Sequence, residues 1–362
     1  MLNTLSSNVV LAKARTKYGR RLTPGDYNEL LKCRNVGEVA GYLKNHTVYS
    51  HALAGTAENE VHRGALESLL KQKQMEDYYS LCKYEAEVDK HFSMGFIRHD
   101  EIEYLLRAVL RLNSHRTKEA DYVFPSYLLR RSCLNLEKLG TVKSAQDLRE
   151  FVRSTPYEKL LEPFLDKPLE RLDYTGIENA LYHYLYGDLL KTIRKYFAGQ
   201  PKKQLLNIYT TFLDLNNYVH IVRMKTVYGT NAETAGRALL PTGTLAEDTL
   251  KKMLKGTTPE EIQGPLRHTK IGRKALDMKC AYLDEIPERM NFQICRHYID
   301  FSIYPSVVLI SYVFLSKTEI RNIITIIEGK RYKLAPEEIR SLLILEERNP
   351  AAVAGLSAQR KE

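Results

Sequence analysis

Apolar residues recur three and four positions apart along most of this chain, and the pattern is clearest between Phe314 and Leu343. It predicts a helix that we expect to end at Gly329, because glycine commonly terminates helices. Pro336 fits the first position of the next helix, and acids follow it where the helix dipole favours them. The apolar residues on the shared face of the first helix are Ile320, Ile323, Ile324 and Ile327.

Helical spacing extends over the rest of the chain. Thr23-Pro24 and Thr258-Pro259 are typical helix entries, since threonine caps a helix and proline fits its first turn. No segment alternates apolar and polar residues as a half-buried strand does, so we expect an all-α fold. Longer helices are expected over residues 1–20, 58–84, 99–113, 174–197, 204–228, 284–312 and 314–329.

The pattern occurs three times. Glu38-Val39, Asp147-Leu148 and Glu261-Ile262 occupy corresponding places at similar intervals, each near the start of a short helix. We therefore expect three related helical domains in a pseudo-threefold, funnel-like arrangement; chance similarity between amphipathic helices is the alternative. The expected domains are 1–120, 121–232 and 233–349, followed by a disordered tail over 350–362.

One acidic residue recurs in the helix that closes each unit: Glu101, Asp214 and Glu319. The simpler interpretation is a surface acid near a helix start, stabilised by the helix dipole. The alternative is a buried acid whose hydrogen bonds fix how the closing helix packs, with Asn217 or Asn322 nearby. The sequence leaves both open.

The net charge of +10 and the isoelectric point near 9.1 favour acidic partners, which include nucleic acid, anionic lipid and acidic protein surfaces. The basic residues are dispersed along the chain, and no helix-turn-helix with a basic recognition helix is recognisable. A basic helical scaffold that binds nucleic acid is therefore the alternative function.

Sequence motifs for catalysis are absent. The chain contains no GxxxxGK, GxGxxG, HExxH or GxSxG, and its five cysteines form no CxxC pair. We expect no catalytic residue, no cofactor, no metal site and no disulfide framework.

No apolar run is long enough to span a membrane, and the first residues lack the features of a secretory signal, so a reducing, cytoplasmic setting is expected.

Two segments of the chain together resemble a known family, the central-stalk subunit of V/A-type ATPases. It is called the C subunit in archaeal and bacterial complexes and the d subunit in eukaryotic ones. Thr318 departs from the resemblance, because the family commonly has an acidic residue at this position. We expect this position to be exposed. The residues that carry the resemblance are Lys317, Glu319 to Ile323, Glu328 to Lys330, Pro336 to Arg340, Leu22 to Tyr27, and Leu30-Leu31.

The resemblance implies a non-catalytic, funnel-shaped protein on the cytoplasmic face of the membrane. Such a protein receives the end of the rotary shaft in its cavity and sits on the proteolipid ring. It couples ATP hydrolysis or synthesis to proton or sodium transport. The implied partners are the shaft subunits, the ring and anionic lipid head groups, and no nucleic acid is expected.

The loops between short and long helices recur once per unit and are our candidates for a contact surface. Equivalent loops would lie at one end of a threefold funnel. The candidate interface residues are His46, Tyr49, Thr155, Tyr157, Arg267 and Lys270, and the candidate packing residues of the repeat are Glu101, Asp214, Glu319 and Asn322.

Overall fold

The computed structural model describes residues 2–57, 61–85, 93–114, 124–166, 171–278, 280 and 282–346. Every regular element in this part of the chain is a helix, which confirms the all-α fold. The tail predicted over 350–362 lies outside the described residues.

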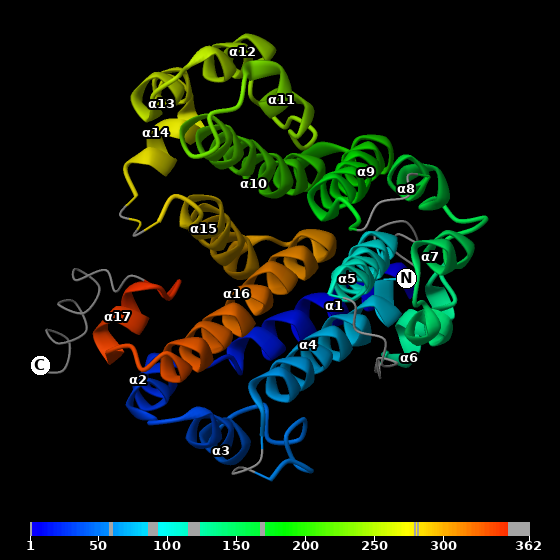
Figure 1. Cartoon of the computed structure of the whole chain (residues 1–362). Helices are drawn as coiled ribbons and strands as arrows, with labels where there is room; N and C mark the ends of the chain where they lie inside the picture. The colour runs from blue at the N-terminus through cyan, green and yellow to red at the C-terminus, as the bar shows by residue number, and fades with distance from the viewer. Residues whose placement is uncertain are drawn as a thin grey trace, which may run out of the picture.

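Long helices form the body of the molecule (Figure 1). Helices α1, α4 and α16 pack side by side, α5 packs against α9, and α10 contacts α9, α15 and α16. Their bounds are α1 Leu2–Gly19, α4 Arg63–Glu85, α5 Ser93–Asn113, α9 Tyr174–Tyr196, α10 Gly199–Thr226, α15 Glu285–Phe301 and α16 Pro305–Arg331.

Short helices gather in three groups at the edge of this body (Figure 1). Helices α2, α3 and α17 lie at the lower left of the view, α6 to α8 at the right, and α11 to α14 at the top. A pseudo-threefold funnel stays a prediction. The bounds are α2 Pro24–Lys32, α3 Val36–His46, α6 Ser126–Arg131, the 3₁₀ helix η1 Leu136–Thr141, α7 Ala145–Phe151, α8 Glu158–Leu165, α11 Ala232–Arg237, α12 Glu247–Lys255, α13 Pro259–Arg267, α14 Lys270–Leu276 and α17 Pro336–Ser341.

Each group of short helices packs on a long helix through buried apolar side chains. The right-hand group belongs to a large cluster that includes α5 and α9, and the upper group packs on α10 and α15. The lower group joins the two ends of the chain, because Leu30 and Leu43 share a cluster with Ile323 and Ile327 of α16. The boundaries of three consecutive domains stay a prediction, and this cluster shows that the first short helices pack on the last long helix.

Matching caps begin one short helix in each group. Asn35, Ser144 and Thr258 accept hydrogen bonds from the backbone N–H three residues later. The donor residues are the acids of the predicted repeat, and each carboxylate accepts a bond from the N–H just before the cap, at 2.8, 2.9 and 2.8 Å. These reciprocal bonds satisfy helix-end donors that lack an intrahelical partner, so the repeated acids have a local structural cause.

The single helix expected over 284–312 is wrong. Helix α15 ends at Phe301, the backbone is extended at Ser302 and Tyr304, and α16 begins at Pro305. Proline lacks an N–H donor and has a fixed φ, so it suits the first turn of a new helix rather than the interior of a longer one. The apolar run continues on both sides of this break, which is why hydrophobic spacing placed the boundary too late.

Gly329 does not end its helix, since α16 continues to Arg331. A Cβ atom at Gly329 would lie 2.5 Å from Cγ1 of Ile339 in α17, so the glycine permits a close approach of the two helices. The left-handed residue of the following turn is Lys333, with φ of 58°.

Thr318, expected to be exposed, is instead 5% exposed, and its hydroxyl donates to the carbonyl of Phe314.

A search of the described helices for a membrane span finds none that is both long and apolar enough. The prediction from the sequence agrees with this finding for that part of the chain.

We expect Gly329→Ala to lower the free energy of unfolding by about 1–3 kcal/mol, because the new methyl group overpacks the contact with Ile339. Gly64→Ala is the control, since Gly64 is exposed in the first turn of α4 and a Cβ atom there meets nothing within 4 Å. It should leave stability unchanged or raise it by up to about 1 kcal/mol through helix propensity. Urea unfolding measures both, and equal effects at the two positions would contradict the packing role.

Candidate functional site

The three recurring acids lie where a long helix meets a group of short helices, and we call each such contact a joint. Glu101 of α5 and Asp214 of α10 are 1% and 0% exposed, so the surface interpretation is wrong for both. Glu319 of α16 is partly buried. All three carboxylates accept hydrogen bonds from other segments of the chain, which is the arrangement that the alternative, a packing acid, requires.

Asp214 forms the joint with the upper group of short helices. Its carboxylate accepts bonds from the backbone N–H groups of Gly243, Thr244 and Leu245 at 2.8, 2.7 and 3.1 Å, and from the Thr244 hydroxyl at 3.0 Å. Burial raises the pKa of Asp214, although these donors favour the ionised form and oppose the shift. The loop passes close to α10, where a Cβ at Gly243 would lie 2.5 Å from Cβ of Thr210.

Glu101 forms the joint with the right-hand group. It accepts bonds from the N–H of Cys133 at 2.7 Å, the hydroxyl of Ser132 at 2.6 Å and the hydroxyl of Tyr157 at 2.5 Å. Tyr157 is fully buried, and burial followed by the charge of Glu101 raises its pKa. The tyrosine therefore remains a protonated donor at neutral pH.

Glu319 forms the joint with the lower group in a similar way. It accepts a bond from the N–H of Leu22 at 2.9 Å and one from the hydroxyl of Tyr49 at 2.6 Å. Tyr49 and Tyr157 occupy the same place in their Thr-x-Tyr segments. The third segment has Ile271 instead, and at that joint the carboxylate is satisfied by backbone N–H groups and a threonine.

Asparagines add a second link to two of the joints. Asn322 accepts from the N–H of Ile344 at 3.0 Å and donates to its carbonyl at 2.8 Å. Asn217 makes the same pair of bonds with Leu240, at 2.8 and 3.0 Å. Each asparagine lies one helical turn after the acid of its joint. Asn217 and Asp214 bind neighbouring residues of one loop, whereas Asn322 binds the segment after α17 and Glu319 binds the segments on either side of α2 and α3.

The candidate interface residues separate into buried and accessible ones. Tyr49 and Tyr157 are 5% and 0% exposed, so placing them at a contact surface is wrong; their hydroxyls complete joints. Thr155 is partly buried and donates its hydroxyl to the carbonyl of Val152. The exposed candidates are His46, Arg267 and Lys270.

A cavity of about 360 Å³ lies between the long helices. Helices α5, α9, α10, α15 and α16 all contribute to its lining, so it contacts the three helices that carry the joints. Aromatic rings form one wall: Phe314 has ring centroids 5.7 and 5.8 Å from those of Tyr209 and Phe212. We call this space the central cavity.

A polar chain runs beside these rings. Lys317 Nζ lies 2.9 Å from Nε2 of His99, whose Nδ1 lies 3.3 Å from Oδ1 of Asp100. Both Tyr78 and Tyr79 donate to the other oxygen of Asp100. A neutral His99 can donate from Nδ1 to Asp100 and accept at Nε2 from the Lys317 ammonium, so both ring nitrogens are then hydrogen-bonded. Burial lowers the pKa of Lys317.

Sequence reasoning missed this chain because His99 and Lys317 are 218 positions apart and belong to different helices. Neither residue has a ligand or catalytic spacing of its own. In the described part of the chain, no group of three or more His, Cys, Asp or Glu residues is placed to hold a metal ion.

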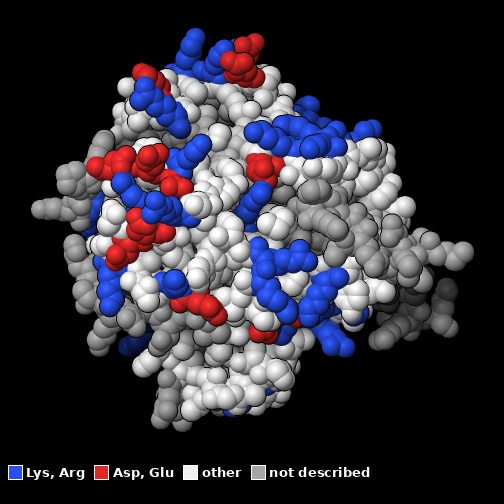
Figure 2. Space-filling view, turned by 90° about the vertical axis from the view of Figure 1, so that its right-hand side faces the viewer, with Lys and Arg blue, Asp and Glu red and all other residues white. Residues whose placement is uncertain are grey.

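Charge is unevenly distributed over the face that lies at the right of Figure 1. Figure 2 shows Lys and Arg gathered across the middle of this face and Asp and Glu mostly toward one side. The short helices α6 to α8 lie on this side of the molecule, and their region includes the exposed residues Arg130, Lys143 and Arg153. An acidic partner would be attracted to such a face in a salt-dependent way.

Comparisons with known proteins agree on one family. Residues 10–342 match the model of the ATP synthase (C/AC39) subunit. The C subunit of the A-type ATP synthase of Methanocaldococcus jannaschii is 22% identical over 351 residues, which cover 92% of this chain and 85% of that protein. The protein of the same name from Pyrococcus horikoshii is 26% identical over 210 residues, which cover 56% of this chain and 55% of that protein.

We expect Asp214→Ala to lower the free energy of unfolding by about 2–4 kcal/mol, because the substitution removes the acceptor of four hydrogen bonds, one of them from the buried N–H of Leu245. Asp248→Ala, at an exposed position of α12, is the control and should cost less than about 1 kcal/mol. Thermal melting and urea unfolding measure the two variants. A loss below about 0.5 kcal/mol for Asp214→Ala would leave the acid only a marginal role in the joint.

The stability that Asp100 contributes should depend on pH. Burial raises the pKa of Asp100, but the hydrogen bond from His99 and the charge of Lys317 outweigh it, so the pKa lies below its usual 3.8. A depressed folded-state pKa stabilises the fold above about pH 3.8, and this contribution is lost as the pH falls through the folded-state pKa.

Asp100→Asn should therefore be less stable than wild type near neutral pH, and the difference should shrink below about pH 3.8. Urea unfolding of both proteins across this pH range measures it. Asp248→Asn is the exposed control. A difference that stays constant throughout the range would show that the Asp100 charge does not stabilise the fold.

Proposed function

Because this chain belongs to the ATP synthase (C/AC39) subunit family, which contains the C and d subunits of V/A-type ATPases, we propose that it is a non-catalytic central-stalk subunit of a rotary ATPase. In this role it links the rotating shaft to the membrane-embedded proteolipid ring. It thereby couples ATP hydrolysis or synthesis to proton or sodium transport. Its place is peripheral, on the cytoplasmic face of the membrane.

The central cavity is the observation that carries this proposal. Its lining includes residues of α5, α10 and α16, the three helices whose acids form the joints, so a partner seated there contacts all three of these helices at once. The aromatic wall around Phe314 offers apolar surface to a side chain at the tip of the shaft. Lys317 and Arg321 offer positive charge beside it.

The ring would meet the accessible residues of the short-helix groups. His46, Arg267 and Lys270 are exposed and belong to the lower and upper groups. Their charge suits acidic loops of the ring or anionic lipid head groups, whose attraction for basic residues falls off within a Debye length. The nucleic-acid alternative stays untested, because the basic face in Figure 2 suits any acidic partner and does not single out nucleic acid.

We expect the purified protein to co-elute from a sizing column with the shaft subunits of the same ATPase. Asn216→Trp should abolish co-elution, because Asn216 lines the central cavity and the indole would occupy it. Asn207→Trp makes the same change at an exposed position of the same helix, outside that lining, and should leave binding intact.

Thermal melting of both variants checks that they remain folded. Failure of the wild-type protein to co-elute with the shaft subunits would overturn the proposed function. Normal co-elution of a folded Asn216→Trp variant would instead exclude the central cavity as the shaft site.

A further inference from the structure

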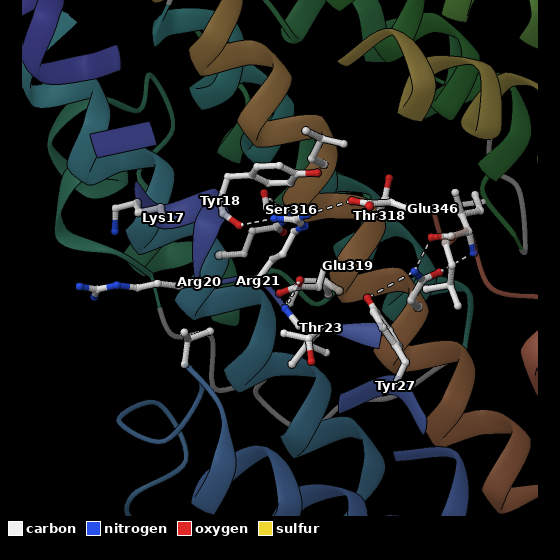
Figure 3. A pocket seen from close by; sticks show the side chains of 18 of the residues that line it. Lys17, Tyr18, Arg20, Arg21, Thr23, Tyr27, Ser316, Thr318, Glu319 and Glu346 are labelled. Atoms are coloured by element: carbon white, nitrogen blue, oxygen red, sulfur yellow. Dashed lines mark hydrogen bonds and ion pairs between the residues drawn. The ribbon is translucent and has the colours of Figure 1, made fainter. Parts of the chain in front are cut away.

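A second cavity, of about 1190 Å³, is separate from the central cavity and larger than it. It lies where the turn between α1 and α2 meets α4, α16 and residues 344–346 (Figure 3). Tyr18, Phe292 and Tyr312 give it apolar surface. The proposed shaft contact does not use this space, which we call the N-terminal cavity.

The lining of the N-terminal cavity carries more positive than negative groups. A ligand in this space is therefore surrounded by excess positive potential, which low-dielectric walls concentrate. The lining cations are Lys17, Arg20, Arg21, Lys73, Arg296 and Arg340, and the lining carboxylates are Asp77, Glu319 and Glu346.

On the α4 side of the cavity, one carboxylate forms ion pairs with two ammonium groups. Asp77 pairs with Lys17 through one oxygen, at 2.6 Å, and with Lys73 through the other. All three side chains are only 20–28% exposed, so solvent screens them incompletely. One positive charge remains uncompensated within this trio.

On the α16 side, the charges are closely paired and the arginines are held in place. Arg21 lies over the Tyr18 ring with its guanidinium carbon 4.2 Å from the centroid, and it pairs with Glu346 at 2.9 Å. Arg296 pairs with Glu346 and also with Asp300. This network fixes the wall of the cavity and orients Arg21 there before any ligand arrives.

Two further arginines have no carboxylate partner among the described residues. Arg20 is exposed and makes no side-chain hydrogen bond or ion pair there, and its side chain extends to the same side as Lys17 in Figure 3. Arg340 donates only to the side-chain oxygen of Asn28, a neutral acceptor. Both guanidinium groups therefore retain donors for an anion.

We propose that the N-terminal cavity binds a small molecule or head group that carries two or more phosphate groups. Phosphate suits this lining because guanidinium groups bind its oxygens with paired hydrogen bonds and lysines add point charges. The cavity is open to solvent on one side, and its volume of about 1190 Å³ is near the scale of small-molecule sites and too small for a duplex nucleic acid. The aromatic side chains can cover an apolar part of the ligand.

Binding at this place would tie together the two ends of the chain. Lys17 and Arg20 belong to the first segment, Lys73 to α4, and Arg340 to α17. A polyanion that contacts them adds a link beside the joint at Glu319, where the same segments meet. A ligand that binds only the folded protein raises its melting temperature as the ligand concentration rises.

Isothermal titration calorimetry with inorganic triphosphate at low salt tests the proposal on the full chain. We expect saturable binding to one site, weakened on the order of tenfold by Arg20→Ala, since a charged hydrogen bond is lost. Arg20 has no partner among the described residues, so this variant should fold normally. Arg130→Ala removes the same charge from an exposed position of α6 and should bind as the wild type does.

Lys73→Gln is the second variant and should weaken binding as well, because it removes a cation from the trio around Asp77. Vesicles of phosphatidylcholine with an added phosphoinositide identify the source of the phosphate. If they bind the protein in competition with triphosphate, a lipid head group is the ligand. If they do not bind while triphosphate does, the ligand is a free phosphate compound.

The proposal is overturned if triphosphate shows no saturable binding to the wild-type protein. It is also overturned if Arg20→Ala and Arg130→Ala weaken binding equally, because the effect would then reflect net charge alone. An acidic peptide that displaces triphosphate and binds more tightly in the same assay would likewise replace the phosphate ligand with a protein partner.

Discussion

The fold depends on buried carboxylates that accept hydrogen bonds from chain segments far away in the sequence. Without Asp214, the backbone donors of the loop at Gly243 to Leu245 would lose their acceptor, and the N–H of Leu245 would be left buried and unpaired. Apolar packing alone holds helices together but allows them to slide, because it is non-directional. A carboxylate that receives bonds from defined N–H groups fixes one register, and the three joints do this at three places.

Local signals in the sequence were sufficient for much of the fold. The caps at Asn35, Ser144 and Thr258 depend on residues within one turn, so the start of each short helix could be read from spacing. The break before Pro305 could not be placed in the same way, since the apolar run continues across it. Phe301 and Ile303 before the break are exposed and Val307 after it is buried, a difference that the residue types do not reveal. Gly329 shows a related limit: its close neighbour, Ile339, belongs to the next helix, and only the structure reveals the contact.

The sites were harder to predict because their residues come together only on folding. An acid before an apolar run has the same pattern whether it faces water or a loop, so the sequence alone could not place Glu101 in the interior. Tyr157 had a recurring position, but its partner is on another helix, and a surface role fitted the same pattern. His99 and Lys317 had no recurring position at all, and they contact each other in the wall of the central cavity.

In the proposed role the protein passes torque from a shaft to a ring, and it must then not absorb the motion by internal rearrangement. Hydrogen bonds to a charged group contribute about 1.5–3 kcal/mol each, several times the thermal energy, so a joint with several such bonds resists displacement of its loop. The lower joint has a further structural role, because Glu319 connects the first short helices to the last long helix and so links segments from opposite ends of the chain. Its carboxylate receives one backbone and one tyrosine donor, fewer than Asp214 receives, and the charged N-terminal cavity lies directly beside it. The connection with the fewest bonds to its acid is thus the one where a bound polyanion would add most to rigidity.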